Sequence, residues 1–176
     1  QQGKGLDGEG IHVCIVDTGV DLNHDDLDHL NIGFRDFVSS SDTPLDHGLD
    51  NHGTMMVGIL VADGHLKGAA PGVSLSVAAA LGEREGGETV GETSLVAKAV
   101  EWCWKVMGAD IISLSLGGMQ DENATSGKEV EDAVSEALSK GVFIVAAAGN
   151  DGGIADDGLV SSPANVPLVI SVGASV

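Results

Sequence analysis

Three residues of the kinds that catalyse acyl transfer stand at the ends of apolar runs in this sequence. Asp17 follows the run Ile11 to Val16, His52 opens an apolar helical segment, and Asn150 follows an apolar run that begins at 142. A carboxylate can orient an imidazole and stabilise its protonated form, and a side-chain amide can donate to a developing oxyanion. The three residue types therefore predict general acid–base chemistry, provided that the fold brings them together.

The order of the apolar segments predicts a fold that would do so. Strands are expected within 11–17, 31–37, 74–81, 109–118, 142–153 and 167–176, and helices within 51–63, 94–108 and 127–141. This alternation is typical of an α/β fold with three layers, in which helices cover both faces of a doubly wound, mainly parallel sheet. The ligand crevice of such a sheet lies beyond the carboxyl ends of its strands. No linker or repeat divides the chain, so residues 1–176 are expected to form a single domain.

Local patterns add four expectations about these elements. The first helix should have one apolar face, the second should be capped by Thr93 or Ser94, and Glu83 to Glu92 should be an exposed loop. The apolar face consists of Met55, Met56, Ile59 and Leu60. Cys14 falls in a strand and Cys103 in a helix, so two buried free thiols are expected rather than a disulfide.

Composition limits the partners that the chain could have. With 27 acidic against 8 basic residues, the formal net charge is −19, which argues against binding to nucleic acid or to an anionic membrane. Hydrophobic residues make up 43% of the chain, and no apolar stretch approaches the length of a membrane span. A soluble globular protein is therefore expected. The polar, glycine-rich start is unlike a secretory leader, and its Gln-Gln is typical of a processed chain or an excised piece.

Four motifs together resemble the subtilisin-like serine peptidases. They are DTG at Asp17, NHGT at His52, SLSLGG from Ser113 and AAAGN ending at Asn150, in the order and at the spacings of that family. Taken singly, each motif is ordinary turn, cap or surface chemistry, but the joint pattern covers nearly the whole chain. The resemblance implies a subtilisin-like fold and a serine-type endopeptidase with an Asp-His-Ser triad. In it, Asp17 would orient His52, His52 would be the general base and acid, and Asn150 would donate to the oxyanion.

The same resemblance implies residues that bind the substrate. It assigns one wall of the pocket for the residue before the scissile bond to Ser115, Leu116 and Gly117, the other wall to Ala147, Ala148 and Gly149, and a second substrate edge to Gly91. The small, apolar walls favour apolar side chains before the cut. No cofactor is expected for the chemistry. Asp26 occupies a position that binds a structural calcium ion in many relatives, although the loop after the first helix, DGHLKG, is short.

The nucleophile of the family is missing from this sequence. The family serine lies in a Gly-Thr-Ser-Met-Ala type motif well after the oxyanion asparagine, and neither Ser94 nor Ser126 falls in that register. In a member of this family, loss of the serine lowers turnover about 10⁶-fold. The chain by itself is therefore expected to be inactive, with peptide or protein substrates and with a C-terminal segment or companion chain that carries the serine.

Two alternatives stay open on the sequence alone. The first is a catalytically inactive peptide-binding or scaffold module with the same crevice. The second is a doubly wound nucleotide-binding domain, which the glycines of GKGLDGEG disfavour because they precede the first strand rather than follow it. Relatives of this kind are mostly secreted, so a secreted or extracytoplasmic location is expected. Free thiols and the absence of a leader would instead suit the cytoplasm.

Overall fold

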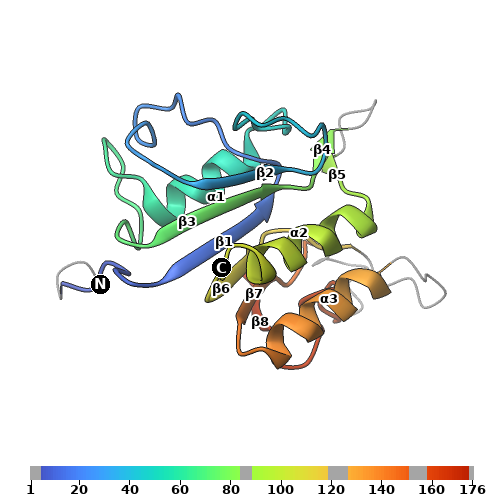
Figure 1. Ribbon diagram of the computed structural model, residues 1–176. Helices are drawn as coiled ribbons and strands as arrows, with labels where there is room; N and C mark the ends of the chain where they lie inside the picture. The colour runs from blue at the N-terminus through green and yellow to red at the C-terminus, as the bar shows by residue number, and fades with distance from the viewer. Residues whose placement is uncertain (1–4, 84–88, 119–126, 151–157, 175–176) are drawn as a thin grey trace.

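The computed structural model describes residues 5–83, 89–118, 127–150 and 158–174 (Figure 1). A six-stranded sheet runs through the molecule in the order β2-β3-β1-β6-β7-β8, and every pair of neighbouring strands is parallel. Its strands are β1 (His12–Asp17), β2 (Gly33–Asp36), β3 (Ser74–Ala79), β6 (Ile111–Leu114), β7 (Phe143–Ala147) and β8 (Ile170–Val172). The helices are α1 (His52–Val61), α2 (Thr93–Lys105) and α3 (Lys128–Ser139). Among the described residues, no helix is long and apolar enough to span a lipid bilayer.

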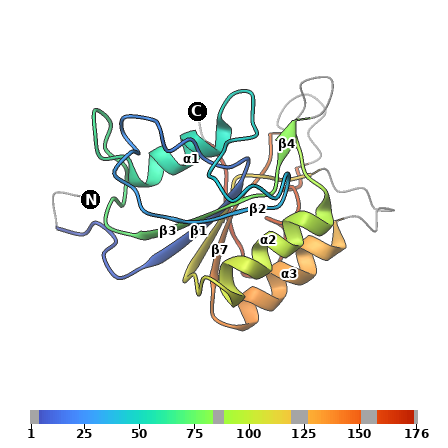
Figure 2. The same ribbon diagram turned by 45° about the horizontal axis from the view of Figure 1, so that its top comes forward.

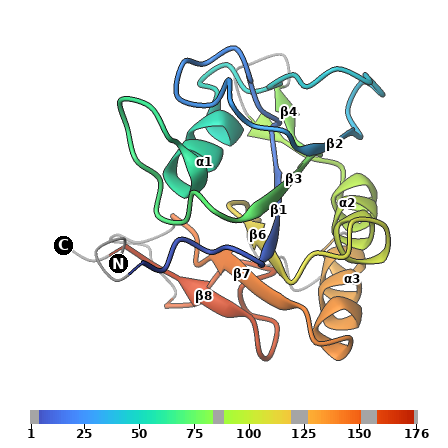
Figure 3. The ribbon, with the colours of Figure 1, turned by 60° about the vertical axis from the view of Figure 1, so that its left-hand side comes forward.

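Helices cover both faces of the sheet. Successive residues of the central strand β1 point to opposite faces, so they belong alternately to two different hydrophobic cores. Val13 and Ile15 pack with Val57 and Val61 of α1 on one face. On the other face, Cys14 and Val16 belong to the core that α2 and α3 complete. Figure 3 shows α1 on one side of the sheet and α2 with α3 on the other, and Figure 2 shows the latter two side by side. The predicted three-layer, doubly wound α/β fold is confirmed.

The strand register places three predicted segments at one edge of the sheet. Val16 of β1 lies opposite Leu114 of β6, and Leu114 lies opposite Ala146 of β7. The next residue along each of these strands therefore lies at the same carboxyl edge of the sheet. These residues are Asp17, Ser115 and Ala147, and neighbouring strands at this edge are about 4.8 Å apart.

The prediction of two free thiols was wrong. Cys14 and Cys103 form a disulfide with a Cα–Cα distance of 5.7 Å, and both residues are fully buried. The two residues are 89 positions apart in the sequence. Parallel strand order and helix docking bring them together, which neither local segment could indicate. The bond fastens β1, the strand that ends in Asp17, to α2.

Three local expectations also differ from the structure. Of the predicted apolar face of α1, Leu60 packs against the core, whereas Met55 and Ile59 are 48% and 66% exposed, respectively. The helix instead buries Gly53, Thr54, Val57 and Val61. Glu92, not Thr93 or Ser94, is the N-cap of α2, and its side chain makes no capping hydrogen bond. Within the expected loop from Glu83, an antiparallel pair forms between β4 (Gly82–Glu83) and β5 (Thr89–Val90), while residues 84–88 lie outside the described residues.

Candidate active site

Asp17 and His52, which are 35 residues apart in the sequence, meet at the carboxyl edge of the sheet. His52 Nδ1 lies 2.8 Å from Asp17 Oδ1, and the same carboxylate oxygen accepts the backbone N–H of Thr18 at 2.7 Å. Asp17 is fully buried at the end of β1, whereas the His52 side chain at the start of α1 is 32% exposed. With Nδ1–H donating to Asp17, Nε2 is the ring nitrogen left to face a reactant, and no described residue hydrogen-bonds to it.

The surroundings of this pair change the proton affinity of both groups. Burial raises the pKa of Asp17, and the hydrogen bonds from His52 and Thr18 offset only part of that effect. Burial alone would lower the pKa of His52. The hydrogen bond and charge of Asp17, with the charges of Asp50 and Asp46, outweigh burial and raise the pKa of His52 above its ordinary value. The imidazole is therefore well suited to hold a proton that it has just accepted.

The two predicted pocket walls lie at the same edge as Asp17. Ser115, Leu116 and Gly117 follow β6, and Ala147, Ala148 and Gly149 end and follow β7. A segment that sequence analysis did not assign joins them: Gly118 N donates to Ser162 O at 3.2 Å, and Ser161 N donates to Ala148 O at 2.8 Å. Residues 161–162 thus connect the segments that follow β6 and β7 through backbone hydrogen bonds.

Asn150 and Gly91 occupy different places around this edge. Asn150 is exposed, three positions beyond the end of β7. Gly91 lies between β5 and α2, and a Cβ there would overlap the side chain of Leu81 and come within 2.9 Å of Ala80 O. Ala80 and Leu81 donate their backbone N–H groups to Asp17 O at 2.9 and 3.2 Å. Gly91 therefore packs against the segment that borders Asp17, and only a residue without a side chain fits there.

A cavity of about 210 Å³ lies beside Gly91. It is lined by Val38, Ala80, Gly82, Glu83, Val90, Gly91, Glu92 and Leu95. The lining thus combines aliphatic residues and glycines with two acidic residues, Glu83 and Glu92.

The residues around Asp26 do not fit a calcium ion bound there. Asp26 is buried, and its Oδ1 accepts the backbone N–H of His65, while its carbonyl oxygen accepts the N–H of Asp63 at 3.2 Å. Calcium takes six to eight oxygen ligands, whereas the groups placed against Asp26 Oδ1 and its carbonyl oxygen are N–H donors. Among the described residues, no group of three or more His, Cys, Asp or Glu side chains could hold a metal ion. The short loop after α1 thus closes directly on the carboxylate.

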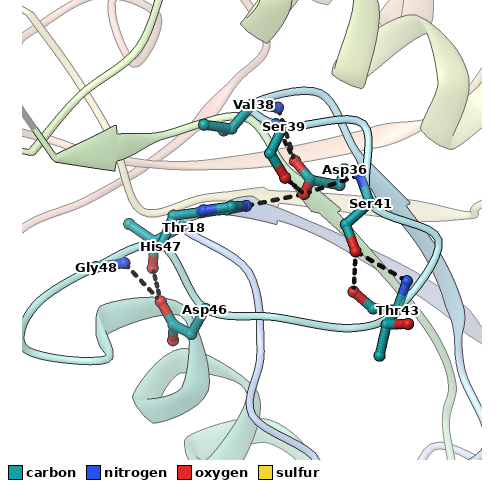
Figure 4. A network of polar contacts seen from close by, with 9 residues as sticks. All are labelled: Thr18, Asp36, Val38, Ser39, Ser41, Thr43, Asp46, His47 and Gly48. Atoms are coloured by element: carbon teal, nitrogen blue, oxygen red, sulfur yellow. Dashed lines mark hydrogen bonds and ion pairs between the residues drawn. The ribbon is translucent and has the colours of Figure 1, made fainter.

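Sequence analysis, which expected no strand or helix within residues 38–50, missed a polar network in this segment between β2 and α1. Figure 4 shows its two carboxylates, Asp36 and Asp46. Asp36 accepts a hydrogen bond from His47 Nε2 at 2.9 Å, and the backbone N–H of His47 donates to Thr18 O at 2.8 Å. The segment is therefore fastened to the residue that follows Asp17. Its signal in the sequence is the frequency of Asp and Ser, which is typical of loops that bond to their own backbone.

The family comparison agrees with the motifs. The family model described as the Subtilase family matches residues 8–176. The "Major intracellular serine protease" of Bacillus subtilis (strain 168) is 35% identical over 176 residues, covering 97% of this chain and 52% of that protein. The "Thermophilic serine proteinase" of Bacillus sp. (strain AK1) is 38% identical over 175 residues, covering 97% of this chain and 39% of its own length. The chain therefore spans about half the length, or less, of these curated relatives.

Solved structures show the same fold. The protease domain of PatA superposes with a TM-score of 0.78 at 26% identity, covering 97% of this chain and 60% of that one. A cold adapted subtilisin-like serine proteinase gives a TM-score of 0.77 at 29% identity, with coverage of 97% and 57%. The matched family model, the curated relatives and the shared architecture establish that this chain belongs to the subtilase family of serine peptidases.

Proposed function

We propose that the protein containing this chain is a serine endopeptidase, in which the chain supplies the acid Asp17, the base His52 and the oxyanion donor Asn150. The nucleophilic serine would come from a segment outside this sequence or from a companion chain. The observation that carries the proposal is the 2.8 Å contact between His52 Nδ1 and Asp17 Oδ1 at the carboxyl edge of the sheet, in a chain of this family. Without the serine, we expect the chain to be inactive.

Each residue has a definite task in the proposed reaction. His52 Nε2 would take the proton of the serine hydroxyl as its oxygen attacks the peptide carbonyl carbon. The Asp17 carboxylate would hold the Nδ1–H tautomer and stabilise the imidazolium, while the Asn150 amide donates to the carbonyl oxygen as it becomes negative. His52 would then give its proton to the leaving amine, and water would release the acyl group by the reverse transfers. These steps use protein groups and need no cofactor.

The substrate would lie between two backbone edges. Gly91 would pair with an extended peptide on one side, and the segment Ser115 to Gly117 on the other, as in strand addition to a sheet. With Ala147 to Gly149 as the facing wall, the space before the cleaved bond would be narrow and apolar. A peptide with an apolar residue at that position is therefore the substrate that we propose.

Exposed apolar residues support a covering segment. On α1, Met55 and Ile59 are 48% and 66% exposed, and on the edge strand β8, Ile170 and Val172 are 51% and 53% exposed. Apolar side chains on both an outer helix face and a sheet edge are typical of surfaces that another part of the same domain covers. The curated relatives are about twice as long or more, so we propose that a segment outside this sequence covers these residues and carries the serine.

The disulfide bears on location. A fully buried bond between β1 and α2 forms and persists in an oxidising environment, which favours a secreted or extracytoplasmic protein over a cytoplasmic one.

The net charge of −19 disfavours nucleic acid and anionic membranes as partners.

The test uses the full-length protein that contains this chain. We expect it to react with a fluorophosphonate probe and to hydrolyse a chromogenic peptide with an apolar residue before the cut. His52→Ala should abolish both reactions without changing the circular dichroism spectrum, and Asn150→Ala should lower kcat by about 10²–10³-fold. The control is His29→Ala, which changes an exposed histidine. Failure of the folded wild-type protein to label or to hydrolyse would favour a peptide-binding module instead.

A further inference from the structure

We propose that Asp46 is a positioning residue, which holds the first turn of α1 against the segment that follows Asp17 and so fixes the contact between His52 and Asp17. The role in catalysis rests on the function proposed above, whereas the positioning itself rests only on the geometry. Asp46 lies six residues before His52, outside every motif that indicated the family.

The Asp46 carboxylate binds both motifs at once. Its Oδ1 accepts the hydroxyl of Thr18 at 2.7 Å and the N–H of Gly48 at 2.9 Å (Figure 4). Its Oδ2 accepts the N–H of Thr54 at 2.8 Å and the hydroxyl of Thr54 at 2.6 Å. Thr18 is the neighbour of Asp17, and Thr54 is two residues after His52. One carboxylate therefore connects the strand end that carries the acid to the helix start that carries the base.

Two further bonds connect the same segments to each other. The Thr18 hydroxyl, which donates to Asp46, accepts the N–H of Gly53 at 2.8 Å. The Thr54 hydroxyl likewise accepts the N–H of Asp21 at 2.9 Å. Asp46 thus orients the hydroxyl protons of Thr18 and Thr54. Each hydroxyl donates its proton to the Asp46 carboxylate, and its oxygen accepts a backbone N–H from the other segment. Loss of the carboxylate would remove the shorter acceptor of the Thr18 hydroxyl, leaving Asp17 Oδ1 at 3.3 Å, and would also remove the acceptor of the Thr54 hydroxyl.

The charge of Asp46 must be separated from its hydrogen bonds. The charges that act on His52 are Asp17 from β1 and Asp46 with Asp50 from the segment before α1. Asp50 is exposed, and its carboxylate hydrogen-bonds to no other described residue. Asp50→Asn therefore removes a negative charge near His52 without removing a bond, and it is the matched control for Asp46→Asn.

The first experiment measures kcat and KM against pH in the full-length protein. Both Asp46→Asn and Asp50→Asn should shift the acid limb of kcat to lower pH, because each removes a charge that favours protonated His52. Only Asp46→Asn should lower kcat on the pH plateau, by about tenfold or more with little change in KM, since small displacements of a catalytic group cost large factors. Equal plateau kcat values for the two variants would overturn the proposal.

The second experiment does not need activity. In ¹⁵N NMR spectra, wild-type His52 should show a slowly exchanging Nδ1 proton in its hydrogen bond to Asp17, and Asp50→Asn should retain it. Asp46→Asn should lose or broaden that signal, and its unchanged presence would refute the positioning role even if the protein hydrolyses no peptide. If Asp46→Asn does not fold, the pair Thr54→Val and Thr54→Ser replaces it. The serine variant should keep the Nδ1 signal and the valine variant should weaken it, while identical spectra would overturn the proposal.

Discussion

Asp36 should contribute measurably to stability through its ionised form. It is buried at the end of β2 and accepts five hydrogen bonds, from the backbone N–H groups of Val38, Ser39 and Ser41, the Ser39 hydroxyl and His47 Nε2. These donors lower the pKa of Asp36 to about 2 from 3.8 against the opposing effect of burial. At 1.36 kcal/mol per pKa unit, the ionised carboxylate stabilises the fold by about 2 kcal/mol.

The perturbation is Asp36→Asn, which replaces one acceptor oxygen by a donor that faces N–H groups. Because folding lowers the pKa, the stabilisation is fully present above pH 3.8 and is lost as the pH falls through about 2. With a urea m-value of about 2 kcal/mol/M, the midpoint at pH 7 should fall by about 1 M. The difference between Asp36→Asn and wild type should then shrink as the pH is lowered from 5 toward 2.

The assay is urea unfolding of the full-length protein, followed by tryptophan fluorescence, at pH 7, 5 and 3. Asp42→Asn is the control, because Asp42 lies exposed in the same segment and should leave the midpoint unchanged. A midpoint for Asp36→Asn equal to that of Asp42→Asn at pH 7 would refute the reasoning. If the urea midpoint of Asp36→Asn stays below that of wild type by the same amount down to pH 3, the asparagine disturbs packing rather than removing a charge-dependent stabilisation.

Two other predictions concern the disulfide and Asp26. Protein unfolded without reductant should contain no thiol from Cys14 or Cys103 reactive toward Ellman's reagent, and Cys14→Ala with Cys103→Ala should lower the free energy of unfolding by about 2–5 kcal/mol. Reactive thiols at these two positions, or an unchanged urea midpoint, would contradict the bond. Any increase in Tm that calcium causes should be the same in Asp26→Asn as in wild type, because N–H donors lie against Asp26 and no described cluster of metal-binding side chains includes it. A calcium effect that Asp26→Asn abolishes would contradict this.

The sequence predicted the fold class and the edge of the sheet because both follow from patterns that are local. The apolar run before Asp17 is a strand buried on both faces, and parallel strands must end at the same edge. The Cys14–Cys103 bond was not predictable in this way, because it depends on how α2 lies across β1. Asp46 was missed for a related reason: its importance comes from Thr18 and Thr54, which become neighbours only when the two motifs dock.

The error over the buried face of α1 shows how catalysis and packing combine in one helix. His52 can reach Asp17 only if the first turn of α1 lies very close to the segment after β1, and a Cβ at Gly53 would overlap the carbonyl oxygen of Gly19. The face that approaches the sheet must therefore begin with small residues rather than large apolar ones. The larger residues, Met55 and Ile59, are consequently turned outward, where the rest of the proposed domain would cover them. On this reasoning, the glycine after His52 and the exposed apolar face of α1 are two results of one requirement, the short distance between base and acid.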